Sequence, residues 1–222
     1  DFGMDVVGVD KDSSKVDALL QGKVPIYEPG LDTLVQKNMA EGRLRFSTEL
    51  GPAIEEAQAI FIAVGTPPKS DGSADLTFIR EVAASIAQHL NGYKIIVTKS
   101  TVPIGTGQMI EKMVREGAGP KARFAVVSNP EFLREGSAID DFMHPDRVVI
   151  GTRDPRAAAR ARSRRTATRR SAGSARARRF DRRSVPRWPR LAAGQRPHLS
   201  RSSPQRVSGS IAASSWPPTT LR

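Results

Sequence analysis

The sequence predicts an α/β fold: a Rossmann-like, doubly wound parallel sheet followed by a disordered, Arg-rich tail. Short apolar runs alternate with segments of helical periodicity through residues 1–151, which is typical of strands joined by crossover helices. The apolar runs are continuous rather than alternating, as expected for a sheet covered on both faces. The composition then changes: 19 of the 35 Lys and Arg residues lie in residues 152–222, together with only two of the 23 acidic residues.

The elements follow from local patterns in chain order. Residues 4–9 form a Val-rich run that predicts a buried strand, and Ser13 caps a helix that reaches about residue 21. Apolar residues spaced by three and four predict a second helix from residue 31, which Gly42 ends. The other predicted strands are residues 44–47, 59–64, 93–98, 124–127 and 147–150, and the other predicted helices are residues 52–57, 75–90 (capped by Asp75) and 107–115.

Polar residues follow four of these strands: Asp10, residues 65–66, residues 99–101 and residues 128–131. Ligands of open parallel sheets bind outside the carboxyl ends of the strands, so we expect these residues to line one edge. In a dinucleotide-binding fold, an acidic residue in the position of Asp10 accepts hydrogen bonds from the adenosine ribose. A strand-final Asp can also be a helix cap or a surface residue. Lys15 could reach the same ribose, or it could be a solvated helix lysine.

Two threonines and one acidic loop complete the candidate site. Thr66 and Thr101 lie in turns stiffened by the prolines that follow, where they could hold a cofactor or an ordered water, or simply close the turn. The loop after residue 130 carries two carboxylates and a guanidinium: Glu131, Phe132, Leu133, Arg134 and Glu135. This loop fits either the N-terminus of a helix, which favours acids, or a substrate loop that meets a polar ligand.

Four collinear motifs carry a family resemblance: DVVGVDKDSSKVDALLQGKVPIYEPGL at residues 5–31, FIAVGTPPKSDGSADL at 61–76, TKSTVPIGTG at 98–107 and VSNPEFLREGSAIDDFMHPDRVVIG at 127–151. Together they resemble the UDP-glucose/GDP-mannose dehydrogenase family, and the last motif looks like its UDP-glucose branch. The resemblance implies an NAD-dependent oxidation of UDP-glucose to UDP-glucuronate. The alternative substrate is GDP-mannose or a UDP-amino sugar.

The resemblance also implies roles for the candidate residues. Asp10 and Lys15 match contacts to the adenosine ribose of NAD, Thr66 and Thr101 match cofactor contacts, and Glu135 lies close to the nicotinamide. Residues 131–135 match the loop that binds the sugar nucleotide. Thr101 and Glu131 match residues that position the water of a final hydrolytic step.

In the family, a cysteine thiolate captures the intermediate aldehyde, and the resulting thioester is hydrolysed. This sequence has no cysteine, so we expect the chain itself to be inactive. The glycine-rich phosphate turn would fall before residue 1, so we also expect a truncated N-terminus and a sheet whose first strand is missing.

The predicted domains are a partial NAD-binding domain at residues 1–151 and a disordered basic tail at residues 152–222, interpreted as out-of-frame translation. A rival hypothesis is an inactive dinucleotide fold whose arginines bind nucleic acid non-specifically. The three histidines show no metal-ligand spacing, and no apolar run is long enough to cross a bilayer. We expect a cytoplasmic chain, and the resemblance implies that intact family members are homo-oligomers.

Overall fold

A computed structural model describes residues 4–158 and the backbone of residues 210–215. The strands form one 6-stranded sheet in the order β2-β1-β6-β3-β4-β5. The strands are β1 (Asp5–Val9), β2 (Leu44–Ser47), β3 (Ala59–Ala63), β4 (Tyr93–Thr98), β5 (Arg123–Ser128) and β6 (Ser210–Ser215), and the helices are α1 (Ser13–Leu20), α2 (Leu31–Ala40), α3 (Leu50–Glu56), α4 (Thr77–His89), α5 (Thr106–Ala118) and α6 (Ala138–Met143). The first five strands lie where the sequence predicts them.

Pairing within the sheet confirms the parallel α/β prediction. β1 pairs in parallel with β2, and β3, β4 and β5 pair in parallel with one another. β6 is antiparallel to both β1 and β3, so β1 and β3 point the same way. The carboxyl ends of all five strands therefore meet at one edge of the sheet.

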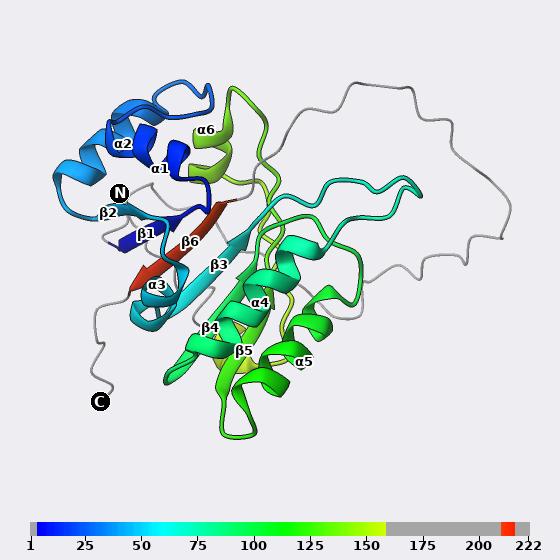
Figure 1. Ribbon diagram of the computed structural model, residues 1–222. Helices are drawn as coiled ribbons and strands as arrows, with labels where there is room; N and C mark the ends of the chain where they lie inside the picture. The colour runs from blue at the N-terminus through cyan, green and yellow to red at the C-terminus, as the bar shows by residue number, and fades with distance from the viewer. Residues whose placement is uncertain (1–3, 159–209, 216–222) are drawn as a thin grey trace, which may run out of the picture.

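The main core lies between the sheet and the helices α3, α4 and α5. Its fully buried members are mostly Ile and Val from the strands and from the inner faces of these helices. Figure 1 shows α4 and α5 side by side across β3, β4 and β5. At Gly117 of α5 a Cβ atom would lie only 2.7 Å from the Cβ of Ala87 on α4. Glycine at this position therefore allows the two helices to pack closely.

A buried lysine holds the end of the sheet opposite the carboxyl ends. The side chain of Lys94, at the start of β4, is 3% exposed. Its ammonium donates to the carbonyl oxygens of Glu55 (2.9 Å) and Ala57 (2.6 Å) at the end of α3. Burial lowers the pKa of Lys94 below its ordinary value, and the Glu55 carboxylate opposes this shift.

β6 differs from the prediction, because it comes from the tail that was expected to lack regular structure. Figure 1 shows this strand, drawn in red, between β1 and β3. The doubly wound order 3-2-1-4-5-6 has its first strand in that place. Backbone groups of two neighbouring strands need partners there, and residues 210–215 pair with both.

The first residues of the predicted tail also belong to the domain. Tyr93 donates to the carboxylate of Asp154 at 3.0 Å, Thr152 donates to the carbonyl oxygen of Val126 at 2.9 Å, and Ala157 is fully buried. The ordered domain therefore extends past Gly151. Residues 159–209 and 216–222, where the out-of-frame tail and the nucleic-acid arm were predicted, lie outside the described residues.

The predicted strand at residues 147–150 is wrong. These residues form no strand, and the isolated bridge next to them pairs Ser128 with Gly151. The carbonyl oxygen of Val149 accepts a hydrogen bond from the side chain of Asn129, at 2.8 Å. A side chain thus supplies a partner that a sheet ladder would otherwise supply. None of the helices among the described residues has the length and apolarity needed to span a membrane.

Candidate site at the carboxyl edge of the sheet

Asp10 follows β1 at this edge and is 7% exposed. One carboxylate oxygen accepts from the backbone amide of Asp12 at 3.0 Å, and the other lies 3.9 Å from the Lys15 ammonium. Asp12 is the N-cap of α1 and accepts from the Ser14 amide, so the cap lies one residue before the predicted Ser13. A cap bound to its own turn fixes the start of α1, and with it the Asp10–Lys15 pair.

The ends of β3 and β4 are joined by side chains that bond to the neighbouring backbone. Thr66 donates to the carbonyl oxygen of Thr101 at 3.0 Å, and Ser100 donates to the carbonyl oxygen of Val64 at 2.6 Å. These hydrogen bonds hold the turn that contains Thr66 against the turn that contains Thr101. Thr101 is exposed.

The end of β5 joins the same edge. The Asn129 amide donates to the carbonyl oxygen of Thr98 at 2.9 Å, which fixes the start of the acidic loop beside β4. Burial lowers the pKa of Lys99, and the Glu131 carboxylate opposes this shift. Lys99 is therefore a half-buried lysine whose charged form the Glu131 carboxylate favours. In the sequence, Lys99 is one of the polar residues that follow a predicted strand, and no local signal marks its partial burial.

The acidic loop is exposed from Glu131 to Glu135, and two pairs shape it. Arg147 lies over the ring of Phe132 with 4.5 Å to its centroid. Arg134 forms a two-point contact with Asp141 of α6, at 2.6 and 3.1 Å. This pair lowers the pKa of the Asp141 carboxyl and raises that of Arg134.

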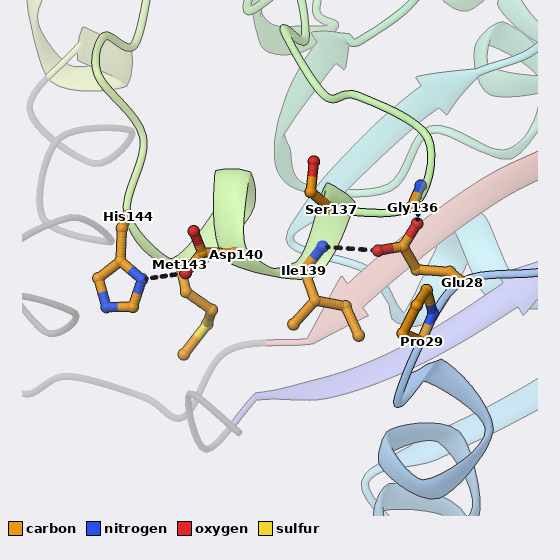
Figure 2. A pocket seen from close by; sticks show the side chains of 8 residues that line it. All are labelled: Glu28, Pro29, Gly136, Ser137, Ile139, Asp140, Met143 and His144. Atoms are coloured by element: carbon orange, nitrogen blue, oxygen red, sulfur yellow. Dashed lines mark hydrogen bonds and ion pairs between the residues drawn. The ribbon is translucent and has the colours of Figure 1, made fainter.

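Glu28 fixes the other end of this loop, although it lies more than a hundred residues away in the chain. Its carboxylate accepts from the backbone amides of Gly136 (2.8 Å) and Ile139 (3.4 Å), as the dashed lines of Figure 2 show. Gly136 has a φ of 81°, a conformation that favours glycine, where the chain turns from the loop into α6. Glu28 was not among the predicted site residues, because its only local signal is an acid beside a proline in a connecting loop.

A shallow hollow of about 420 Å³ lies beside this clamp. It is formed by Glu28, Pro29, Gly136, Ser137, Ile139, Asp140, Met143 and His144. Figure 2 shows the two Glu28 bonds on one side and the His144–Asp140 pair on the other. The hollow therefore adjoins the acidic loop and lies apart from the sheet edge itself. Among residues 4–158, no three His, Asp or Glu side chains gather closely enough to hold a metal ion.

The described residues fit one half of a dinucleotide. Asp10 and Lys15 present a buried carboxylate and an ammonium at the strand end where an adenosine ribose is held. The pyrophosphate needs a central strand that ends at this edge and turns into a helix N-terminus. β6 begins at this edge, since Ser210 pairs with Ala63 and Ile211 with Val9. Within the described residues, no such turn leads out of the central strand, and the pyrophosphate half does not fit.

Sequence comparison adds to this geometry. The model of the UDP-glucose/GDP-mannose dehydrogenase family, NAD binding domain, matches residues 1–165 of the chain. The chain belongs to this family. The match extends past Gly151, in agreement with the packing of residues 152–158, and the family's NAD-binding domain is the part that the chain carries.

Among curated relatives, UDP-glucose 6-dehydrogenase of Rhizobium meliloti (strain 1021) is 55% identical over 152 residues, which are 68% of this chain and 35% of that protein. UDP-glucose 6-dehydrogenase TuaD of Bacillus subtilis (strain 168) is 50% identical over 159 residues, 72% of this chain and 34% of its own length. The chain thus spans about a third of these relatives.

Two solved structures show the same domain. A UDP-glucose dehydrogenase from the hyperthermophilic archaeon Pyrobaculum islandicum matches with a TM-score of 0.70 and 43% identity, covering 73% of this chain and 38% of that one. A ternary complex of GDP-mannose dehydrogenase from Pseudomonas aeruginosa matches with a TM-score of 0.72 and 36% identity, covering 74% and 39%. Rossmann-like architecture is therefore shared across both branches of the family.

Proposed function

We propose that this chain carries the NAD-binding portion of a UDP-glucose 6-dehydrogenase, and that the chain by itself completes no oxidation. The observation that supports the proposal is the gathering of Asp10, Thr66, Thr101 and the 131–135 loop along one edge of a parallel sheet. The identities of 55% and 50% to UDP-glucose 6-dehydrogenases favour UDP-glucose over GDP-mannose as the sugar nucleotide.

Each side chain has a role that its position allows. Asp10 accepts hydrogen bonds from ribose hydroxyls, and Lys15 keeps that carboxylate oriented from 3.9 Å. Thr66 holds the Thr101 turn in place, so the Thr101 hydroxyl and the Glu131 carboxylate can share a water molecule in front of β4. The exposed loop from Glu131 to Glu135 offers backbone amides and the Glu135 carboxylate to a polar sugar nucleotide.

The chain lacks the group that would complete the reaction. Oxidising an aldehyde to an acid requires a nucleophile on the carbonyl carbon, and a thiolate forms a thioester that water can cleave. No cysteine occurs in the chain. In the proposed function this chain therefore binds and orients the adenosine ribose of the cofactor and the sugar nucleotide, while another part of an intact enzyme supplies the thiolate.

A chimera tests the assignment. Residues 5–151 of this chain replace the matching segment of the Rhizobium meliloti relative, and NADH formation is followed with UDP-glucose, GDP-mannose and a UDP-amino sugar. We expect turnover with UDP-glucose, and none from the unmodified chain. Turnover restricted to another sugar nucleotide would refute the substrate assignment, and steady NADH formation by the chain alone would refute the proposed inactivity.

Variants of the chimera test the residues. Asp10→Asn should raise the KM for NAD about tenfold or more and leave the KM for UDP-glucose unchanged, since of the two ligands only the ribose of NAD would bond to this carboxylate. Glu131→Gln should lower kcat. Glu116→Gln, an exposed residue of α5 far from the edge, is the matched control.

A further inference from the structure

We propose that the space between β1 and β3 is a binding site for an extended peptide strand, and that residues 210–215 of this chain occupy it in cis. β6 pairs residue by residue with β1 and β3, which we call the two walls of the site. On β1 the pairs run from Asp5↔Ser215 to Val9↔Ile211, and on β3 they run from Ala59↔Ser214 to Ala63↔Ser210. In the sheet order, β6 alone separates β1 from β3. This inference depends on the sheet and is independent of the proposed enzymatic function.

Backbone chemistry explains why the space binds a strand. Without an occupant, β1 and β3 would each present a row of amide and carbonyl groups without partners, flanked by the buried side chains of Val9, Ile60 and Ile62. Water cannot readily reach such groups inside a core to form hydrogen bonds with them. A buried backbone group without a partner raises the free energy of the folded state. An added strand supplies partners to two edges at once, whereas strand addition at the rim of a sheet supplies them to one.

The occupant must be an uncharged segment, because it lies in the centre of the sheet. The tail carries 19 arginines, yet residues 207–221 contain no charged residue. Residues 210–215, SIAASS, have small or aliphatic side chains throughout. The segment that pairs with β1 and β3 thus comes from the one long part of the tail without charged residues, which is the part that can be buried in the centre of a sheet.

The geometry gives a direct readout for each wall. The amides of Val6 and Asp10 donate to β2, so by the alternation of a strand the amides of Val7 and Val9 point toward β6. The carbonyl oxygen of Ile62 accepts from β4, so the amide of Phe61 points toward β6. Amide hydrogen exchange can therefore separate the β6 side of each wall from its other side.

The test uses the full chain and proline substitutions in β6. Proline cannot donate to a ladder and is excluded from central strands. Ala212→Pro and Ala213→Pro should each lower the exchange protection of Val7, Val9 and Phe61 by about tenfold or more, with Gly8 less affected because its amide faces β2. The control is Ala193→Pro, the same substitution elsewhere in the tail, which should change none of these amides.

A synthetic peptide with the sequence of residues 207–217, added in excess to the Ala212→Pro chain, should restore the protection. Equal protection in the Ala212→Pro, Ala213→Pro and Ala193→Pro chains would overturn the proposal. Protection that rises with chain concentration, together with a dimeric mass in solution, would overturn occupation in cis and show that a second copy donates the strand. A Pro variant that unfolds entirely and refolds with the peptide supports the proposal, and one that the peptide cannot rescue counts against it.

Discussion

The Glu28 clamp offers the sharpest test of how the acidic loop is held. Glu28 belongs to the connection between α1 and α2, and its carboxylate accepts from the amides of Gly136 and Ile139, at 2.8 and 3.4 Å. Replacing Glu28 with Ala removes both acceptors. Replacing it with Gln keeps one neutral oxygen and removes the charge, so the two variants separate the presence of an acceptor from its charge.

The expected loss follows from the two bonds. A hydrogen bond to a charged group contributes about 1.5–3 kcal/mol when it is well formed, but the carboxylate is half-buried and the bond to Ile139 is long. We therefore expect Glu28→Ala to destabilise the closed loop by about 1–2 kcal/mol, which corresponds to roughly five- to thirtyfold in a local opening equilibrium. Glu28→Gln should lie between wild type and Glu28→Ala.

Native-state hydrogen exchange of the Gly136 and Ile139 amides measures this effect directly. Protection should fall at these two amides, and the core amides of β4 should be unaffected because they open only with global unfolding. Glu116→Gln, at a surface pair of α5, controls for loss of charge alone. Unchanged protection at both loop amides in Glu28→Ala would show that the clamp does not hold the loop.

Three further perturbations test the packing and electrostatics of the domain. Lys94→Met should lower the free energy of unfolding by about 2–3 kcal/mol in a urea titration, because two buried carbonyl oxygens lose their donor, and full stability in that variant would contradict the buried role. Gly117→Ala should destabilise by about 1–3 kcal/mol despite its better helix propensity, because its Cβ meets α4, whereas Gly107→Ala in the same helix, with its nearest neighbour at 3.6 Å, should be neutral or stabilising. Because Arg134 lowers the pKa of Asp141 below 3.8, this pair stabilises the loop above about pH 4, and its contribution is lost as the pH falls through the pKa of the folded state. Hydrogen exchange at the Arg134 amide, which donates to Asp141, should show this loss of stability. Asp141→Asn should remove the pH dependence.

The sequence was enough to predict most of the architecture, because apolar runs and helical spacing are local. The first five strands and the helices from α1 to α5 lie close to their predicted positions, since each one encodes its own buried face. The polar strand ends were equally readable: in a parallel sheet, sequence order alone places Asp10, Thr101 and Glu131 at one edge. The motifs within these segments also indicated the family that the comparison identified.

Contacts between distant segments could not be read in this way. Residues 148–150 are apolar, so residues 147–150 suggested a strand, but the Asn129 side chain donates to the carbonyl oxygen of Val149 that a ladder would use. Residues 210–215 carry no alternation or strong strand propensity, and they form a strand only because two neighbouring edges need partners. Glu28 and Asp141 carry no local signal of their role, because the fold alone brings Glu28 to the Gly136 amide and Asp141 to the Arg134 guanidinium.

Periodicity and strand-end chemistry, which depend on neighbours within a few residues, therefore determined the α/β class and the candidate edge, and the collinear motifs indicated the family. Tertiary structure decided the central strand, the anchoring of the acidic loop and the half of a dinucleotide that the described residues can accommodate. The physical reason is that a backbone or carboxylate group without a local partner takes whichever partner the folded chain brings within hydrogen-bonding distance.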